Sequence, residues 1–249
     1  MYTDGAWEEP ADGDPPIPAG WGAAEFDIQT APRGSDPTFP IEQLLSNARP
    51  TGPRAGLNWV AAGMVVDDPE EGEKDEYIGA EASTNNTGEL SALYWALKRA
   101  ATHRRGQGGT LIWTDSLYAL NMTTGTWLPR KKRCRTLVRN LRSEWRELQR
   151  ARPGEVKLRH VRSYVKIPGN ELADWLAELR YAAKTEAERH SSGDRRLLDN
   201  ATQWLQTWLT APAQYCGATP HAGRANDAQR GVNDTDRSPG SLGDATGEG

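Results

Sequence analysis

The chain has 249 residues, enough for one domain with additions or for two small domains. Apolar residues make up 37%, below the roughly 45–50% typical of globular proteins, so we expect part of the chain to lie outside any packed core. No apolar run approaches the roughly 20 residues of a membrane span, the start does not resemble a signal peptide, and two cysteines cannot make a disulfide framework. These features predict an intracellular, non-secreted protein with no membrane partner.

The net charge of −4 conceals a strong asymmetry along the chain. Residues 1–80 hold 16 acidic and 4 basic residues, a net charge of −12, whereas residues 97–166 hold 18 basic and 4 acidic residues, a net charge of +14. So much positive charge in 70 residues favours a polyanionic partner. Charge alone is equally compatible with a solvated helix face.

The first half of the chain predicts three strands followed by a helix. Met1–Ala6 is typical of a strand running into a turn, Gly20–Ile28 of a strand with a glycine-rich entry, and Leu57–Val66 of a buried strand. Thr87–Thr102 has apolar residues at helical spacing, begins with a threonine and has basic residues near its end. The segments near 30–56 and 67–77 are polar, and we expect them to be loop insertions, with one short helical candidate at Pro40–Ala48.

The second half predicts a strand, two helices, a strand and a further helix. The expected elements are Thr110–Thr114 (strand), 116–126 (short helix), Thr136–Ala151 (long helix), Val156–Val161 (strand) and Asn170–Ala183 (helix). Alternation of strands and helices in this order predicts an α/β fold with a mixed sheet.

The last part of the chain has a different composition. Residues 187–211 contain apolar residues at helical spacing, ending in Trp204, Leu205, Trp208 and Leu209, and predict one more amphipathic helix. Residues 212–249 have few apolar residues and predict a disordered tail. We therefore expect one domain over residues 1–186, followed by this helix and the tail.

Four acidic residues lie where carboxylates are poorly solvated or close to an element boundary. Asp4 is at a strand end, Glu89 in the first turn of a predicted helix, Asp115 directly after an apolar strand, and Asp174 on a predicted helix. Converging carboxylates repel one another, and divalent ions are the usual remedy. Mg²⁺ prefers such oxygen ligands.

Each acid also has a simpler interpretation when taken alone. Asp4 could be a turn residue, Glu89 could favour a helix N-terminus, Asp115 could be an N-cap, and Asp174 could pair with Arg180. Caps and pairs of this kind are common. The joint placement of the four is what favours a metal site.

Four motifs, YTDGA, TNNTGEL, TDSLYALN and HVRSYVKIPGNELAD, occur in this order and lie on the expected elements. Together they resemble the type 1 ribonuclease H family over roughly Met1–Lys184. The resemblance implies a ribonuclease H-like fold, a five-stranded mixed β-sheet flanked by α-helices. It also implies metal-dependent hydrolysis of the RNA strand of RNA–DNA hybrids, with products that carry a 5′-phosphate.

The resemblance assigns the same four carboxylates as catalytic and metal-binding residues: Asp4, Glu89, Asp115 and Asp174. They would hold two Mg²⁺ ions, with Mn²⁺ as an alternative, and no small-molecule cofactor is implied. Glu89 also matches the family residue close to the RNA 2′-hydroxyl, and sensing of this group distinguishes RNA from DNA. Asp174 matches the residue that holds the metal activating the attacking water.

The resemblance also suggests residues that bind the hybrid. Asn85 and Asn86 match positions that touch its minor groove, and Thr84 matches a position that contacts phosphate of the DNA strand; all three could instead be cap or turn residues. A basic connection falls where some family members have a basic protrusion: Arg130, Lys131, Lys132, Arg133 and Arg135. Such contacts would make binding strong and salt-sensitive, without sequence preference.

The chain departs from the family at two places. Many members have a mobile histidine ten residues before the last aspartate, where this chain has Tyr164, and a phenol with a pKa of about 10 cannot shuttle protons at neutral pH. His160, four residues earlier, is interpreted as structural. The first strand is also short, because only three residues precede Asp4, which raises the possibility of a fragment, such as part of a retroelement polyprotein.

Two further functions compete with a hybrid-specific endoribonuclease. One is a catalytically weak or inactive nucleic-acid-binding module, consistent with Tyr164 and the short first strand. The other is a different nuclease or integrase on the same sheet, against which the GNELAD and TNNTGEL motifs argue. Protein partners and oligomeric state are left open by the sequence.

Overall fold

The computed structural model describes residues 1–8, 10, 12, 17–26, 56–70, 76–103, 109–129, 134–163, 167–181 and 195–210. These residues belong to one compact unit, Met1–Gly217; a second unit, Ala218–Gly249, lies outside the described residues. The predicted helix Pro40–Ala48, most of the two predicted insertions and the predicted tail also lie outside them.

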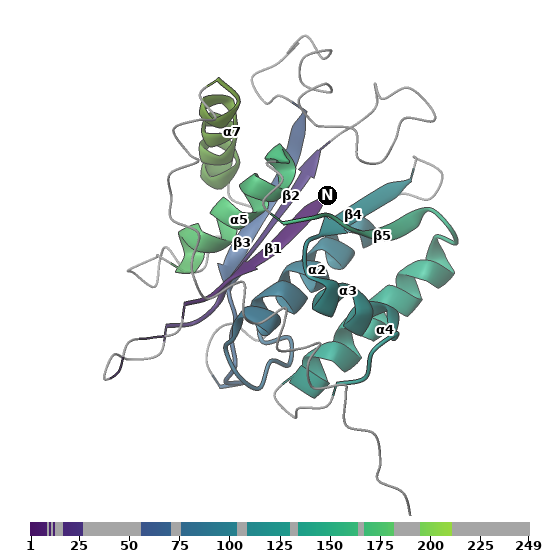
Figure 1. Cartoon of the computed structure of the whole chain (residues 1–249). Coiled ribbons are helices and arrows are strands. Elements are labelled where there is room, and N and C mark those ends of the chain that lie inside the picture. Colours follow the sequence, from purple (N-terminus) through teal and green to yellow (C-terminus); the bar gives the residue numbers. More distant parts are fainter. Residues whose placement is uncertain are drawn as a thin grey trace, which may run out of the picture. The chain divides into compact units, whose positions relative to one another are not determined.

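Five strands form one mixed sheet in the order β3-β2-β1-β4-β5 (Figure 1). The strands are β1 (Tyr2–Ala6), β2 (Gly20–Phe26), β3 (Leu57–Met64), β4 (Thr110–Thr114) and β5 (Val156–His160). β1 to β3 pair antiparallel, and β4 lies parallel to both β1 and β5. This is the predicted ribonuclease H-like fold, with β1 at the centre of the sheet.

The helices confirm the predicted element order, and the first four lie within two residues of their predicted boundaries. They are α2 (Asn85–Ala101), α3 (Leu117–Thr124), α4 (Arg135–Ala151), α5 (Pro168–Tyr181) and α7 (Arg195–Thr210). α2 begins two residues before the predicted start because Thr84 is its N-cap and forms a capping box with Thr87. Gly125 ends α3 in the left-handed conformation that glycine tolerates best.

Two glycines on neighbouring strands let helices approach the sheet from its two sides. A Cβ on Gly5 would lie 2.3 Å from the backbone nitrogen of Glu89 on α2. A Cβ on Gly22 would lie 2.3 Å from the carbonyl oxygen of Ala173 on α5. Gly22 pairs with Asp4, the neighbour of Gly5, and successive residues of a strand face opposite sides. α2 and α5 therefore press on opposite faces of the sheet.

Two main clusters of buried apolar residues fill the space on either side of the sheet. The first joins α2, α3 and α4 to the sheet through residues such as Leu93, Leu97 and Leu141. The second joins β2 and β3 to α5 and α7 through residues such as Leu176 and Leu205. In Figure 1, α3 and α4 lie beside α2, and α7 lies beside α5.

The first strand, β1, has five residues, as many as β4 and β5. β1 pairs with β4 only through Tyr2 and Thr3, whereas β4 pairs with β5 over all five of its residues. The α-amino group of Met1 donates to the carbonyl oxygen of Leu111 at 2.7 Å, and its burial lowers its pKa to about 5. Backbone contacts thus hold the start of β1 against β4.

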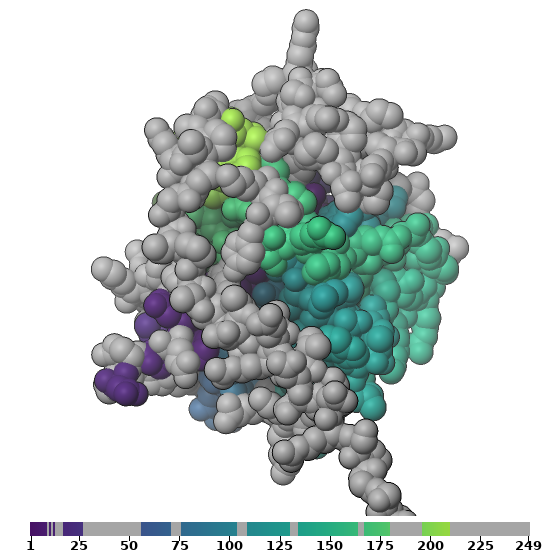
Figure 2. Space-filling view, viewed as in Figure 1, coloured from purple at the N-terminus to yellow at the C-terminus, as the bar shows by residue number. Residues whose placement is uncertain are grey.

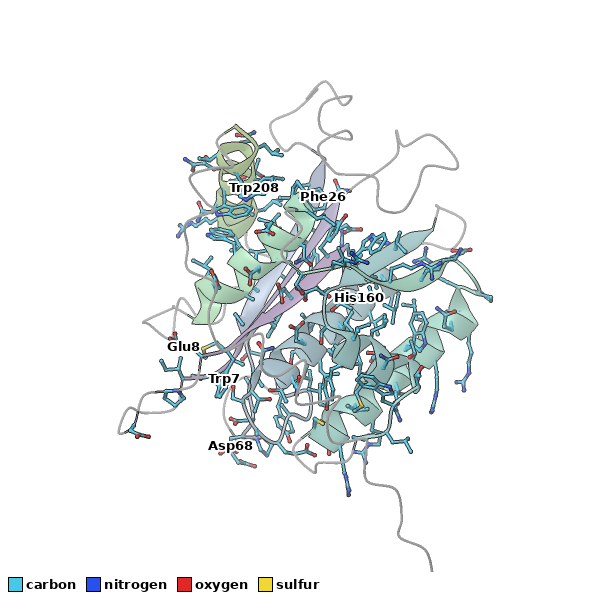
Figure 3. All side chains as sticks on the ribbon, in the orientation of Figure 1. Trp7, Glu8, Phe26, Asp68, His160 and Trp208 are labelled. Atoms are coloured by element: carbon cyan, nitrogen blue, oxygen red, sulfur yellow. The ribbon has the colours of Figure 1, made fainter. Side chains whose placement is uncertain are left out.

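The predicted amphipathic helix beyond the family-like region is α7, and it packs on the domain. Trp204 stacks on Trp175 of α5, with ring centroids 5.4 Å apart, and also on Trp208, at 6.5 Å. Trp208 is labelled on α7 in Figure 3. Leu205 is fully buried among residues of α5, β2 and β3. α7 therefore extends the core at the β3 edge. Among the described residues, no helix has the length and apolar character needed to cross a membrane.

Candidate active site

Glu89 is held by the N-terminal half of α2 and is buried. The prediction that it lies in the first turn is wrong. Because Thr84 rather than a later residue caps the helix, the first turn contains no acidic residue, and Glu89 is the fifth helical residue. Its position is therefore set by packing against the sheet more than by attraction to the helix N-terminus.

Asp4 lies on the central strand β1 and is only 2% exposed. The interpretation of Asp4 as a simple turn residue does not hold, because Asp4 pairs with Gly22 within the sheet, although its Oδ1 does accept a hydrogen bond from the Gly5 amide at 2.8 Å. Gly88 of α2 also faces β1, since a Cβ there would lie 3.3 Å from the Gly5 Cα. The two glycines bring the backbones of β1 and α2 into contact, and so bring Asp4 close to Glu89.

Asp115 follows β4 directly and is half-buried. Its alternative role as the N-cap of the next helix is taken by Ser116, whose hydroxyl accepts from the Ala119 amide at 3.1 Å. His160 lies at the end of β5 (Figure 3), and its Nε2 contacts the backbone oxygen of Asp115 at 3.1 Å. This contact joins the ends of β4 and β5, in keeping with a structural role for His160.

Asp4, Glu89 and Asp115 form one acidic cluster. Each offers one carboxylate oxygen, and these three oxygens all lie within 4.8 Å of one another. Two of the residues are buried, where charges interact more strongly than in water. Three like charges at this separation are unfavourable without a cation, and hard oxygen donors suit Mg²⁺ or a similar divalent ion. The donor set therefore fits the metal that the sequence predicts.

Asn170 lies beside this cluster at the start of α5. Its Nδ2 donates to Oδ2 of Asp115 across 3.4 Å, and the residue is 5% exposed. Its Oδ1 is buried and has no hydrogen-bond partner among the described residues. An unsatisfied buried amide oxygen is costly, and it is another oxygen that a hydrated cation could satisfy.

Asp174 lies on α5, one turn beyond Asn170, and is half-buried. It is not among the three residues whose oxygens lie within 4.8 Å of one another. α5 contacts both β1 and β2, so the helix that carries Asp174 packs against the strand that carries Asp4. The structure thus brings three of the four predicted carboxylates into one cluster, and the role of the fourth remains a prediction.

Three of the residues predicted to bind the hybrid lie at the start of α2. Thr84 is the N-cap of α2, and its hydroxyl accepts from the Thr87 amide at 3.3 Å. This is the cap role named above as the alternative to hybrid binding. Asn86 is exposed, and Asn85 is half-buried with an Oδ1 that has no hydrogen-bond partner among the described residues. A binding role for these three residues stays a prediction.

Part of the predicted site lies outside the described residues. This applies to Tyr164 and to Arg130, Lys131, Lys132 and Arg133 of the basic connection. Arg135 is the first residue of α4 and is exposed.

Comparison with known proteins identifies the family of the chain. The RNase H family model matches residues 52–181, which is more than half of the chain. The chain therefore belongs to the RNase H family. The match begins beyond β1 and β2, so Asp4 joins the site through the geometry of the sheet and not through the matched segment.

Among solved structures, the chain is similar to RNase H1 from the halophilic archaeon Halobacterium salinarum NRC-1, with 22% identity and a TM-score of 0.41 over 71% of this chain and 92% of that one. It is also similar to the N-terminal RNase H domain of a Mycobacterium tuberculosis protein, with 16% identity and a TM-score of 0.43 over 81% and 94%. A third, LC11-RNase H1 in complex with an RNA/DNA hybrid, has 16% identity and a TM-score of 0.39 over 71% and 94%. No curated protein matches the chain.

Sequence reasoning missed how the cluster is assembled. The close approach of Gly5 and Gly88 depends on two segments more than 80 residues apart, although a glycine directly after Asp4 and another directly before Glu89 were visible. The contact of Asn170 with Asp115 was also missed, because the two residues lie 55 positions apart in the sequence.

Proposed function

We propose that this chain is a metal-dependent endoribonuclease that hydrolyses the RNA strand of RNA–DNA hybrids. One observation carries the proposal: three carboxylates from β1, α2 and the end of β4 converge within 4.8 Å in a member of the RNase H family. Carboxylates of this kind are the ligands with which nucleases hold two divalent ions. A buried acidic cluster would be a poor choice for a module that only binds a polyanion, because it would repel phosphate.

In this proposal, Asp4, Glu89 and Asp115 hold the ions, and Asp174 on α5 completes the ligand set. When bound, Mg²⁺ or Mn²⁺ would activate water and stabilise charge on the leaving oxygen of the cleaved phosphodiester. Asn170 holds the Asp115 carboxylate through its amide and thereby limits the rotation of that side chain. Glu89 would face the 2′-hydroxyl and so select RNA, as the family resemblance implies.

The start of α2 and the basic segment after α3 would bind the substrate. Asn85 and Asn86 would contact the minor groove, with Thr84 near a phosphate of the DNA strand. The basic residues 130–133 and Arg135 would contact phosphates further along the hybrid. Tyr164 would not replace a mobile histidine in proton transfer, so we expect slower turnover than in family members that have one.

The decisive experiment is cleavage of an end-labelled RNA–DNA hybrid by the purified chain in Mg²⁺, beside RNA–RNA and DNA–DNA duplexes. We expect cutting of the hybrid alone and a 5′-phosphate on the downstream RNA product. Asp115→Asn should abolish cutting, whereas Asp68→Asn, the same chemical change at an exposed residue far from the cluster in sequence, should not. Hybrid binding without cutting by the unaltered chain would favour the inactive binding module instead.

A further inference from the structure

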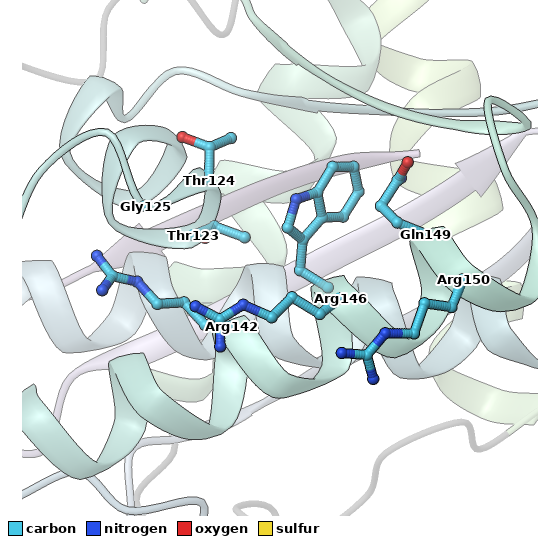
Figure 4. Close-up of a pocket in the computed structure, with 8 residues that line it drawn as sticks. Thr123, Thr124, Gly125, Arg142, Arg146, Gln149 and Arg150 are labelled. Atoms are coloured by element: carbon cyan, nitrogen blue, oxygen red, sulfur yellow. The ribbon is translucent and has the colours of Figure 1, made fainter.

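A second feature, separate from the acidic cluster, is a cavity of about 360 Å³ between the end of α3 and the middle of α4. Figure 4 shows its lining, in which Arg142, Arg146 and Arg150 extend from α4, and Thr124 and Gly125 come from the end of α3. The indole of Trp145 forms part of the wall. The surfaces of α3 and α4 lie next to each other on the face seen in Figure 2.

The three arginines do not have the same role. Arg142 is committed to the fold, because its Nε donates to the carbonyl oxygen of Met122 at 2.7 Å and another of its nitrogens donates to the carbonyl oxygen of Trp127. It thus satisfies carbonyls at and beyond the end of α3, as cations commonly do there. Arg146 and Arg150 are exposed, and within the described part of the chain neither has an ion pair or a hydrogen bond from its side chain.

The acidic residues of α4 do not neutralise this pair. Glu144 forms an ion pair with Lys98 of α2 at 3.3 Å, and the Ser143 hydroxyl donates to Glu147 at 3.1 Å. Glu147 lies three residues before Arg150, but the two side chains form no ion pair of 4.0 Å or less. Two guanidinium groups therefore stand at one cavity with their donors available, and guanidinium groups are well suited to phosphate.

The arrangement of the charges favours a strand over a small anion. The arginines recur every four residues, which spaces them about 6 Å apart along the helix axis. The row continues towards the N-terminus of α4 through exposed Arg139 and Arg135. A linear row of cations matches a linear polyanion, whereas a single small anion would use only one or two of them.

The cavity is also connected to the acidic cluster by a short element. α3 begins two residues after Asp115 and ends at Thr124, so it spans about 12 Å. A strand with a rise of 3.4 Å per nucleotide covers this distance in roughly four nucleotides. A duplex that is bound at the cluster and runs along α3 would thus reach the cavity about four base pairs away.

We propose that the cavity between α3 and α4 binds phosphodiester groups of the substrate strand through Arg146 and Arg150, with Trp145 forming its wall. The substrate assignment, an RNA–DNA hybrid, rests on the proposed function. The binding chemistry rests on the arginines alone. This site adds contact to the duplex away from the point of cutting and sets where the duplex can extend.

The test measures hybrid affinity in an Asp115→Asn background without divalent ions, so that it does not depend on cleavage. The hybrid must extend well past about four base pairs on each side of the cluster. The variant Arg146→Gln/Arg150→Gln should raise Kd roughly 5- to 20-fold at about 0.1 M salt. It should also make the negative slope of log K against log salt less steep by about 1.8. The control Lys157→Gln/Arg159→Gln removes two exposed charges of β5, outside the cavity and outside the arginine row of α4, and it should change Kd no more than about 2-fold.

Equal losses of hybrid affinity in the two double variants would show that positive charge acts wherever it lies on the surface, and would overturn the assignment. So would an unchanged Kd in the cavity variant. Direct binding of inorganic phosphate that the cavity variant abolishes, with hybrid affinity unchanged, would identify a free phosphate site and overturn the assignment to a strand. If the unaltered chain cuts the hybrid and the cavity variant keeps its full hybrid affinity, only this inference is contradicted. If the unaltered chain does not cut the hybrid but the cavity variant loses hybrid affinity, only the proposed function is contradicted.

Discussion

Gly5 on β1 faces the backbone nitrogen of Glu89 on α2 so closely that a Cβ would lie 2.3 Å from it. The contact joins a central strand to the helix carrying a metal-ligand candidate, and backbone cannot move aside as a side chain can. Gly5 therefore sets the distance between Asp4 and Glu89, two of the three clustered carboxylates.

Gly5→Ala should accordingly push α2 away from β1. We expect a loss of about 1–3 kcal/mol in the free energy of unfolding, together with loss of Mg²⁺-dependent stabilisation and of hybrid cutting. Urea unfolding with and without Mg²⁺ measures both effects. Gly125→Ala is the control, because Gly125 has a positive φ but open space around it. It should cost about 1 kcal/mol and leave the effect of Mg²⁺ intact. A Gly5→Ala protein that binds Mg²⁺ normally would contradict this account.

Removing one charge from the acidic cluster should stabilise the metal-free protein. Asp115→Asn relieves like-charge repulsion among three carboxylates, so its unfolding temperature in a chelator should rise by a few degrees, corresponding to roughly 1 kcal/mol. Addition of Mg²⁺ should then raise the unfolding temperature of the original chain but not of the variant. Identical responses to Mg²⁺ in the two proteins would show that the cluster does not hold the ion.

Asn170 should affect turnover more than substrate affinity. Its amide donates to the Asp115 carboxylate over a long 3.4 Å contact, so Asn170→Ala should lower kcat by roughly 10-fold while KM for the hybrid changes little. Steady-state kinetics on the hybrid separates the two constants. Glu171→Ala, at the next position of α5, tests whether any change at this turn has the same effect. A rise in KM with kcat unchanged would instead place Asn170 in substrate binding.

His103 should make stability depend on pH. Burial lowers the pKa of its imidazole below 6.5, although Glu25, 2.8 Å away, opposes this. The unfolded chain therefore gains a proton at higher pH than the folded protein. The contribution of His103 to stability is complete above about pH 6.5 and is lost as the pH falls through its lowered pKa. Urea unfolding from pH 7.5 to 5 should give a steeper decline for the original chain than for His103→Gln. Parallel curves would exclude this contribution.

The helix α7 should be an integral part of the folded domain. Leu205 is fully buried between α5 and the sheet, so Leu205→Ala should reduce the free energy of unfolding by about 2–5 kcal/mol. Gln203→Ala, an exposed position on the same helix, should change it by less than about 0.5 kcal/mol. Comparable small effects for both variants would mean that α7 does not contribute to the core in solution.

Much of the fold follows from local patterns and from the resemblance to type 1 ribonucleases H. Buried strands such as Leu57–Met64 and Thr110–Thr114 have apolar runs bounded by turn residues, and both were predicted within a few residues. The start of α2 was misplaced because two threonines, Thr84 and Thr87, are both plausible caps by sequence. Only the reciprocal hydrogen bonds between them show which one ends the loop.

The candidate site was predictable as a set of residues and not as a geometry. Asp4, Glu89 and Asp115 could be named because each lies in a motif that resembles the family, although only Asp115 directly follows an element in the structure. Their convergence depends on close packing of glycine backbones, which no local pattern encodes. The cavity beside Arg146 was equally hidden, because the capping of α3 by Arg142 exists only once α3 and α4 have packed together.

The pairing of β1 with β4 has a consequence for synthesis of the protein. Tyr2 pairs with Trp113, and so the central strand lacks one of its two neighbours until more than 100 further residues have been made. At about 5–20 residues per second, this delay is of the order of 5–20 s. Over that interval Asp4 is on the ribosome without Asp115, and the nascent chain cannot assemble the acidic cluster. Any nuclease activity can therefore begin only after most of the domain has been translated.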